Sequence, residues 1–217
     1  MADLLQRLIV LFLLCGTALA APFSHRTHLG LKLQCLSCHA SASSSTKIED
    51  NNLPQPAVCL GCHTGEQGKA AKLDGGPSIK TPRQVFLARF NHQQHLKLGN
   101  IASVIAAAID SGAYLSRPGD IRRHLNTKDP CAACHRGLQE SDAVTPAAFP
   151  QMADCLVCHS KVDPPFSCST CHVESPKLKP ASHDSNWFDF HGSGKANLDK
   201  PSCAVCHGRT FTCQGCH

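Results

Sequence analysis

One five-residue pattern, Cys-x-x-Cys-His, occurs seven times in this chain of 217 residues and uses 14 of its 15 cysteines. Two thiols at this spacing can reach the two vinyl groups on one edge of a haem, and the histidine that follows can bind the iron. The pattern therefore predicts seven covalently attached c-type haems, each with its iron. The expected attachment residues are Cys35, Cys38, Cys59, Cys62, Cys131, Cys134, Cys155, Cys158, Cys168, Cys171, Cys203, Cys206, Cys213 and Cys216. The expected proximal iron ligands are His39, His63, His135, His159, His172, His207 and His217.

Two other uses of cysteine explain the pattern less well. A disulfide framework has no need of a histidine after every second cysteine. Structural zinc sites combine Cys-x-x-Cys knuckles in pairs, and seven knuckles leave one without a partner. Haem attachment accounts for both the spacing and the histidine.

The composition points to a core that cofactors fill. Aromatic residues make up only 5% of the chain, and it holds 15 glycines and 14 prolines, so few large side chains are left to pack together. A chain of this kind needs staples or cofactors to fold. We therefore expect little regular secondary structure, mainly short α-helices and loops wrapped around a haem core.

The longest helix is expected over residues 101–111. Its apolar residues recur at helical spacing, with Asn100 as a possible N-cap and Gly112 as a possible C-terminal stop. This apolar stripe is expected to cover a haem face rather than to dock a partner. Its members are Ile101, Val104, Ile105, Ala108 and Ile109. Each Cys-x-x-Cys-His motif is expected to form one helical turn.

Seven histidines lie outside the motifs, as many as there are predicted haems, and this match predicts a second axial histidine for every iron. Two elements repeat among them, Phe23-x-His25-x-x-His28 and Phe90-x-His92-x-x-His95, which we expect to be short strands or turns. Methionine is a poor alternative ligand, because Met152 is the only one outside the N-terminal segment. Bis-histidine haems are expected to have low potentials. The predicted distal ligands are His25, His28, His92, His95, His124, His183 and His191.

The repeated element, the motif that follows it and the further spare histidines resemble class III cytochromes c. The family consists of small, low-potential periplasmic electron carriers with three or four closely packed bis-histidine haems. The resemblance implies that the first histidine of the element serves the nearest haem and the second a later one. Seven haems exceed one such unit, so a tandem version is expected. This order would give the haem at Cys35 to His25, Cys59 to His28, Cys131 to His92, Cys155 to His95, Cys168 to His124, Cys203 to His183 and Cys213 to His191.

The chain divides into a leader and three expected haem modules. Residues 1–20 have the apolar run and the small residues of a secretory signal, ending at Ala20. Cys15 would allow a lipid-anchored start, but Leu14 before it is larger than lipoprotein processing prefers. The modules are expected at 21–80 with two haems, 81–175 with three and 176–217 with two. The mature protein is expected to be exported, to the periplasm or the cell exterior.

The predicted function is electron transfer through closely packed haems, with no catalytic residues. One alternative is a multihaem oxidoreductase with one open iron, and another is a subunit of a polymeric cytochrome wire. The expected partners are other redox proteins, with self-association into a filament or docking to a membrane quinone-linked complex as further options. The formal charge of +5 does not indicate a nucleic-acid partner, because the haem propionates would offset it.

Overall fold

The computed structural model describes residues 23–67, 70, 72–73, 87–159, 168–173, 186, 189 and 200–207. The expected signal segment and the expected module boundaries near residues 80 and 175 lie outside this part of the chain.

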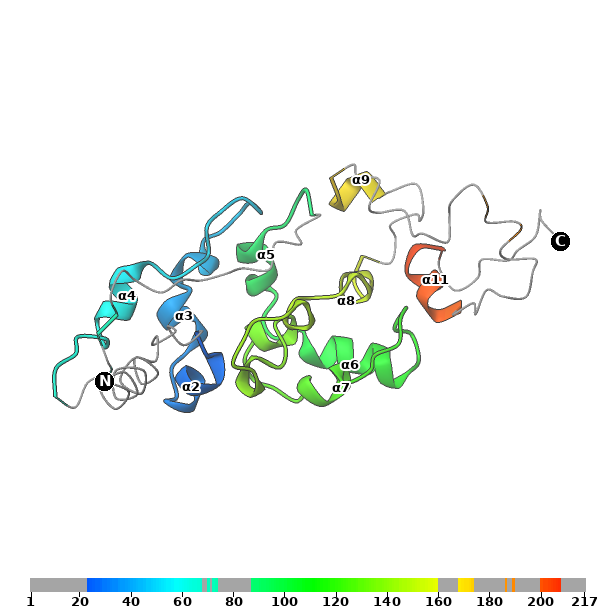
Figure 1. Ribbon diagram of the computed structural model, residues 1–217. Coiled ribbons are helices and arrows are strands. Elements are labelled where there is room, and N and C mark those ends of the chain that lie inside the picture. The colour runs from blue at the N-terminus through cyan, green and yellow to red at the C-terminus, as the bar shows by residue number, and fades with distance from the viewer. Residues whose placement is uncertain are drawn as a thin grey trace, which may run out of the picture.

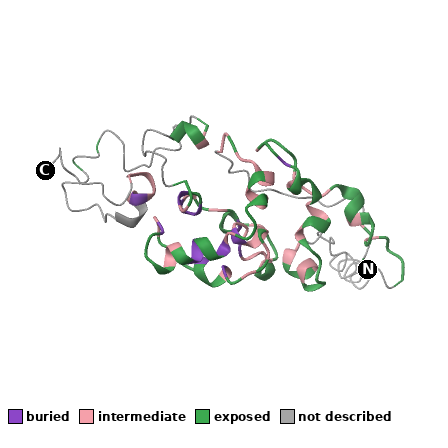
Figure 2. Cartoon of the chain, turned by 180° about the vertical axis from the view of Figure 1, so that it is seen from behind, coloured by how far each residue is buried: buried purple, intermediate pink, exposed green. Residues whose placement is uncertain are grey.

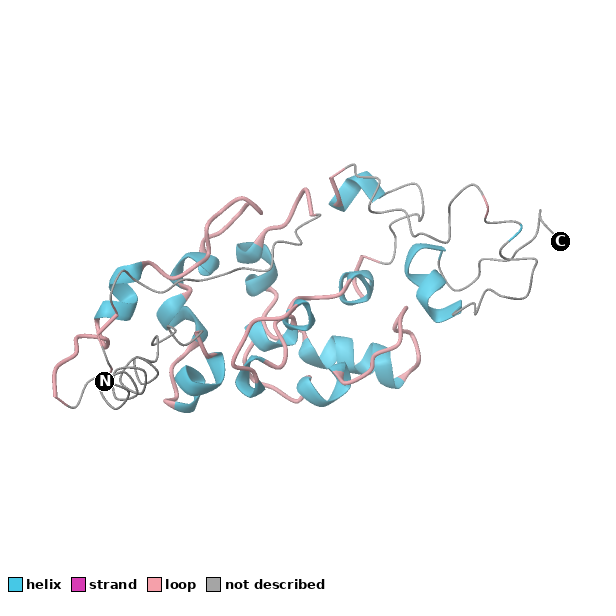
Figure 3. Cartoon of the chain, viewed as in Figure 1, coloured by secondary structure: helices cyan, strands magenta, loops and turns pink. Residues whose placement is uncertain are grey.

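Short helices joined by loops make up the described residues (Figure 3), and these residues contain no strand apart from an isolated bridge between Leu87 and His172. This confirms the expected fold class. The α-helices are spread along an elongated body, with α4 toward one end, outside α2 and α3, and α11 toward the other (Figure 1). They are α2 (His25–Gly30), α3 (Cys35–Cys38), α4 (Pro56–Leu60), α5 (His92–Lys97), α6 (Ala102–Asp110), α7 (Ile121–His124), α8 (Met152–Leu156), α9 (Cys168–Cys171) and α11 (Lys200–His207). The 3-10 turns are η1 (Ala40–Ser43), η2 (Cys131–Ala133), η3 (Leu138–Glu140) and η4 (Pro146–Ala148).

The predicted helix over 101–111 is confirmed as α6, one residue shorter at each end. The side chain of Asn100 accepts a hydrogen bond of 2.9 Å from the Ala102 backbone N–H, so it caps the helix although Ile101 occupies the N-cap position. Gly112 follows the helix with φ +70°, a left-handed conformation that favours glycine and stops the helix.

The buried face of α6 differs in part from the expected stripe. Val104 is 48% exposed, whereas Ala102, Ile105 and Ala106 are buried. This face packs against Ala133 in the third motif, within one small cluster at the centre of the molecule, where Figure 2 shows most of the buried residues. The cluster consists of Ala102, Ile105, Ala106, Tyr114, Ile121, Leu125, Ala133 and Ala153.

Several large apolar side chains beside the motifs are exposed to solvent. Leu36 and Leu60 lie inside the first and second motifs and are 44% and 49% exposed, and Val58 directly precedes Cys59. Burial of such side chains is the main favourable contribution to folding. Haem faces lying against the motifs would cover them.

The expected first and second modules touch through backbone and side-chain hydrogen bonds. In the first contact, the Arg26 backbone N–H donates to the Ser141 carbonyl at 3.1 Å, and the Arg26 side chain forms an ion pair with Asp142. In the second, the Gln93 backbone N–H donates to the Ser45 carbonyl at 2.9 Å. Helix α2 thus lies against η3, and α5 lies beside η1.

A buried ion pair joins the third and fourth motifs. Arg136 follows His135 directly and Asp154 precedes Cys155, and the side chains of both are only 3% exposed. The guanidinium donates to the Asp154 carboxylate at 2.5 Å and 3.2 Å, and the Tyr114 hydroxyl donates to the same carboxylate at 3.0 Å. Because both charges are desolvated, each needs the other to stay buried.

We predict that Arg136→Met lowers the free energy of unfolding of the haem-loaded protein by about 3–5 kcal/mol, because the Asp154 carboxylate is left buried without an opposite charge. Denaturant unfolding followed by circular dichroism measures this. The control is Arg122→Met, which removes an exposed arginine that pairs with exposed Asp110 and should change the unfolding free energy little. Equal effects of the two substitutions would contradict the prediction.

Candidate functional site

In each of the six described motifs the first cysteine lies in a helical turn, which confirms the expectation for these motifs. In five of them the backbone N–H of the histidine donates to the backbone carbonyl of the first cysteine at 2.8–2.9 Å. The turn places the second cysteine three residues after the first and the histidine four residues after it, so all three project on one side. These five motifs begin at Cys35, Cys59, Cys131, Cys155 and Cys168.

The two Phe-x-His-x-x-His elements are helices, and the prediction of strands or turns is wrong. Both histidines of the first element lie in α2, and both of the second lie in α5. Ser24 and Asn91 are the N-caps, and each side chain accepts a hydrogen bond from the backbone N–H three residues on, at 3.1 Å and 2.8 Å. Serine and asparagine are strong N-cap residues, so the sequence held a helix signal at both places.

The second histidine of each element is oriented in the same way. His28 Nδ1–H donates to the Ser24 carbonyl and His95 Nδ1–H to the Asn91 carbonyl, both at 2.8 Å. The phenylalanine of each element stacks on this ring, with centroids 4.5 Å apart in both copies. A hydrogen bond from Nδ1 sets the tautomer and leaves Nε2 free to bind a metal.

Three pairs of imidazoles face each other at nearly the same distance. The ring centroids are 6.3 Å apart for His25 and His39, 6.1 Å for His28 and His63, and 6.3 Å for His95 and His159. Two metal–imidazole bonds of about 2 Å, with about 1 Å from each bonded nitrogen to its ring centre, separate two axial ligands by about 6 Å. The residues present therefore fit a haem iron between the rings of each pair.

His92 and His135 lie close enough for their imidazoles to interact. Burial lowers the pKa of His135, and the nearby imidazoles of His92 and His39 lower it further. Burial also lowers the pKa of His25 and of His92. These rings therefore stay neutral to lower pH than an exposed histidine, and the neutral imidazole is the form that binds metal. His135 Nδ1–H donates to the Ala148 carbonyl at 3.2 Å, which directs Nε2 the other way.

His124, expected as a distal ligand, is mostly buried at the end of α7. Its Nδ1 atom lies 3.8 Å from a carboxylate oxygen of Glu140. A carboxylate next to a ligating histidine is a common supporting contact in metal sites. The expected ligands His183, His191 and His217, together with Cys213 and Cys216, lie outside the described residues.

The cysteines of different motifs lie close enough to affect one another. Burial raises the pKa of the Cys38 thiol, and Cys59 and Cys62 of the second motif add to this. Burial raises the pKa of Cys155 to about 11, with contributions from Asp154, from Cys134 of the third motif and from Cys171 of the fifth. Burial also raises the pKa of Cys206 in the sixth motif, with Cys168 adding to it. Each of the six described motifs therefore has at least one neighbouring motif.

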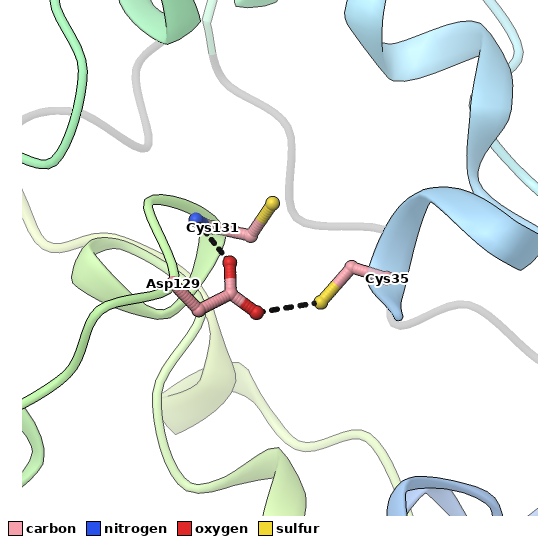
Figure 4. Close-up of side chains that lie close together, drawn as sticks. All are labelled: Cys35, Asp129 and Cys131. Carbon is pink, nitrogen blue, oxygen red and sulfur yellow. Dashed lines mark hydrogen bonds between the residues drawn. The ribbon is translucent and has the colours of Figure 1, made fainter. Parts of the chain in front are cut away.

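The first and third motifs meet most closely, at Asp129. The Cys35 thiol donates to one carboxylate oxygen of Asp129 at 3.1 Å, and the Cys131 backbone N–H donates to the other at 2.9 Å (Figure 4). One carboxylate oxygen and the two sulfur atoms lie within 4.8 Å of one another. Sequence reasoning missed Asp129, because no local pattern relates a residue before the third motif to the first motif.

Comparison with known families gives a match over nearly the entire chain. A family model described as "Outer membrane cytochrome MtrC/MtrF-like, domains II/IV" matches residues 31–217. The comparisons with curated proteins and with solved structures gave no match. Among the described residues, no helix has the length and apolar character that a membrane crossing requires.

We predict that Asn91→Ala lowers the free energy of unfolding by about 1 kcal/mol, because the Gln94 N–H loses its capping acceptor. The His95 ring should keep its orientation, since its hydrogen bond is to the main-chain carbonyl of residue 91. Denaturant unfolding of the haem-loaded protein measures the change. Gln94→Ala is the matched control, because it alters a side chain of the same helix and leaves the cap intact. A loss in the control as large as that in Asn91→Ala would contradict a capping role.

Proposed function

We propose that this chain conducts electrons through seven covalently attached haems. The chain belongs to the MtrC/MtrF-like family of outer-membrane cytochrome domains. Electron transfer by a multihaem c-type cytochrome follows from the family itself. The number seven rests on the seven Cys-x-x-Cys-His motifs. Each bound haem supplies an iron that alternates between the ferric and ferrous states.

The three facing imidazole pairs carry this proposal. Each pair combines a motif histidine with a histidine from α2 or α5, as expected for two axial ligands on one iron. The pairs support the ligand order of class III cytochromes c, in which the first histidine of the element serves the nearest haem and the second a later one. We extend bis-histidine ligation to the remaining irons, with His92 opposite His135 and with His124, His183 and His191 as further distal ligands. No iron then has an open position, which favours electron transfer over a reaction on a bound substrate.

The protein's contribution to low potential lies in the ligands and in their orientation. Histidine on both sides of the iron favours lower potentials than a histidine–methionine pair. The Nδ1–H bonds of His28, His95 and His39 to backbone carbonyls strengthen the imidazoles as donors. Haem faces packed against the motifs would also bury the exposed leucines inside them, Leu36 and Leu60.

The contacts between motifs support a row of haems with a definite order over its first four members. The second motif lies beside the first, the first beside the third and the third beside the fourth. The fifth and sixth motifs lie beside each other and both lie beside the fourth, because α11 of the sixth motif contacts α8 of the fourth. We therefore propose that electrons pass between the haems attached at Cys59, Cys35, Cys131 and Cys155, in that order or its reverse, and between the haem at Cys155 and those at Cys168 and Cys203. The second motif, and not the first, stands at one end of the row, as the position of α4 in Figure 1 suggests.

The ends of this row are where we expect partners to dock. We propose that the donor and the acceptor are other redox proteins, which approach the haem at Cys59 and the haems of the last motifs. An exported protein, in the periplasm or at the cell surface, agrees with the outer-membrane family and with the predicted signal segment.

The test uses protein produced in a host that attaches haem to exported chains. We expect seven haems per chain by mass spectrometry, only low-spin ferric signals by electron paramagnetic resonance, and no carbon monoxide binding by the ferrous protein. A high-spin signal or carbon monoxide binding in the unaltered protein would contradict full bis-histidine ligation, and fewer haems would contradict the count.

We predict that His28→Ala opens one iron, because His28 supplies the ligand opposite His63. The variant should keep all its haems, gain one high-spin signal and bind carbon monoxide at one haem. Thr27→Ala is the control, since it changes the neighbouring residue of α2 and should bind no carbon monoxide. An all-low-spin His28→Ala protein would remove His28 from the ligand set.

A further inference from the structure

The carboxylate of Asp129 lies between the first cysteines of two haem motifs that are 96 positions apart in the chain. It accepts one hydrogen bond from the Cys131 N–H at 2.9 Å and one from the Cys35 thiol at 3.1 Å. The Asp129 N–H in turn donates to the Thr127 hydroxyl at 3.1 Å, which holds the residue in the turn before η2. The hydrogen bonds with Thr127 and Cys131 therefore hold Asp129 in place without a contribution from Cys35.

Attachment of the haems changes the hydrogen bonds of Asp129 in a defined way. This step of the argument rests on the proposed function. Each thiol adds across a haem vinyl group, so that a sulfur–carbon bond replaces the S–H bond and the hydrogen moves to the other vinyl carbon. The Cys35 thiol then no longer donates to Asp129. The donor of the other hydrogen bond is the backbone N–H of Cys131 and not its thiol, so this bond survives attachment and keeps the carboxylate beside both sulfur atoms.

We infer that Asp129 is a shared positioning residue for the haems attached at Cys35 and Cys131, and that its charge lowers the midpoint potentials of both. A ferric haem carries one more positive charge than a ferrous haem, so a nearby carboxylate stabilises the ferric form. The two sulfur atoms lie within 4.8 Å of each other and of the carboxylate oxygen, so both haem edges meet at this charge.

The surroundings of Asp129 leave its charge effective. Asp154 also lies beside a motif, but its carboxylate is neutralised by the buried guanidinium of Arg136. Among the described residues, none of the ion pairs involves Asp129. Partial burial reduces the solvent screening of a charge, so its effect on nearby groups is larger than at the surface. The junction between the first and second modules therefore carries a negative charge at the point where two haem edges meet.

The experiment isolates single haems within the haem-loaded protein. Methionine in place of an axial histidine raises a haem's potential, so His25→Met should separate the couple of the haem at Cys35 from the overlapping couples of the others. His28→Met should do the same for the haem at Cys59, whose attachment motif does not touch Asp129. Asp129→Asn is then introduced into both backgrounds, since asparagine keeps an acceptor for the Cys131 N–H and removes the charge. Spectroelectrochemical titration measures the separated midpoint potential.

We expect Asp129→Asn to shift the separated couple upward in the His25→Met background and to leave it in place in the His28→Met background. Asp110→Asn is the charge-matched control, because it removes a carboxylate that pairs with exposed Arg122 away from the motifs. This control should leave the couple of the haem at Cys35 in place. No shift from Asp129→Asn, or equal shifts in both backgrounds, would overturn the role of Asp129.

Two further outcomes are decisive. If His25→Met separates no couple although the protein carries its haems, the axial-ligand assignment fails, and the proposed ligation falls together with this inference. If Asp129→Asn attaches fewer haems, peptide mass mapping shows which motif is empty. A missing haem at Cys35 or Cys131 supports Asp129 as their positioning residue, whereas a missing haem elsewhere overturns it.

Discussion

The rest of this structure depends on pairs of imidazoles whose ring centroids lie 6.1–6.3 Å apart, a spacing that fits one metal ion between the two rings. His25 and His39, His28 and His63, and His95 and His159 each join a motif to a histidine of α2 or α5. An iron bonded to both rings would tie the two segments together as firmly as a cross-link. The described part of the chain can therefore dispense with strands and long helices, because iron ligands would join its elements in place of extended hydrogen-bond ladders.

The small apolar cluster around α6 shows how little of the folding free energy comes from side chains alone. Half of its eight members are alanines, and the larger ones are Ile105, Tyr114, Ile121 and Leu125. Leucines inside the motifs are left exposed, which is unfavourable unless haem faces cover them. Next to this cluster, the Arg136–Asp154 pair links two motifs through buried charges, so motif-to-motif distances are also set by polar contacts.

The contacts between motifs decide how charge would be distributed along the proposed row of haems. Two carboxylates lie at motif junctions and are treated differently by the fold. Asp154 is paired with a guanidinium, so it contributes almost no net charge to its junction, whereas Asp129 faces two cysteine sulfur atoms. Haems that share chemically identical attachment motifs can thus acquire different potentials from their surroundings, and a row of haems needs such differences to direct electrons.

The cofactor chemistry can be predicted without the fold, because Cys-x-x-Cys-His is a local pattern whose spacing is required for attachment and ligation. The apolar period of residues 101–111 likewise predicts α6, and Ser24 and Asn91 are local N-cap signals for α2 and α5. Three features follow from the folded chain alone: which imidazoles face each other, the position of the second motif outside the first, and the contact of Asp129 with Cys35. Local sequence patterns report on residues a few positions apart, whereas these contacts join segments separated by up to 94 positions and depend on how the loops fold back.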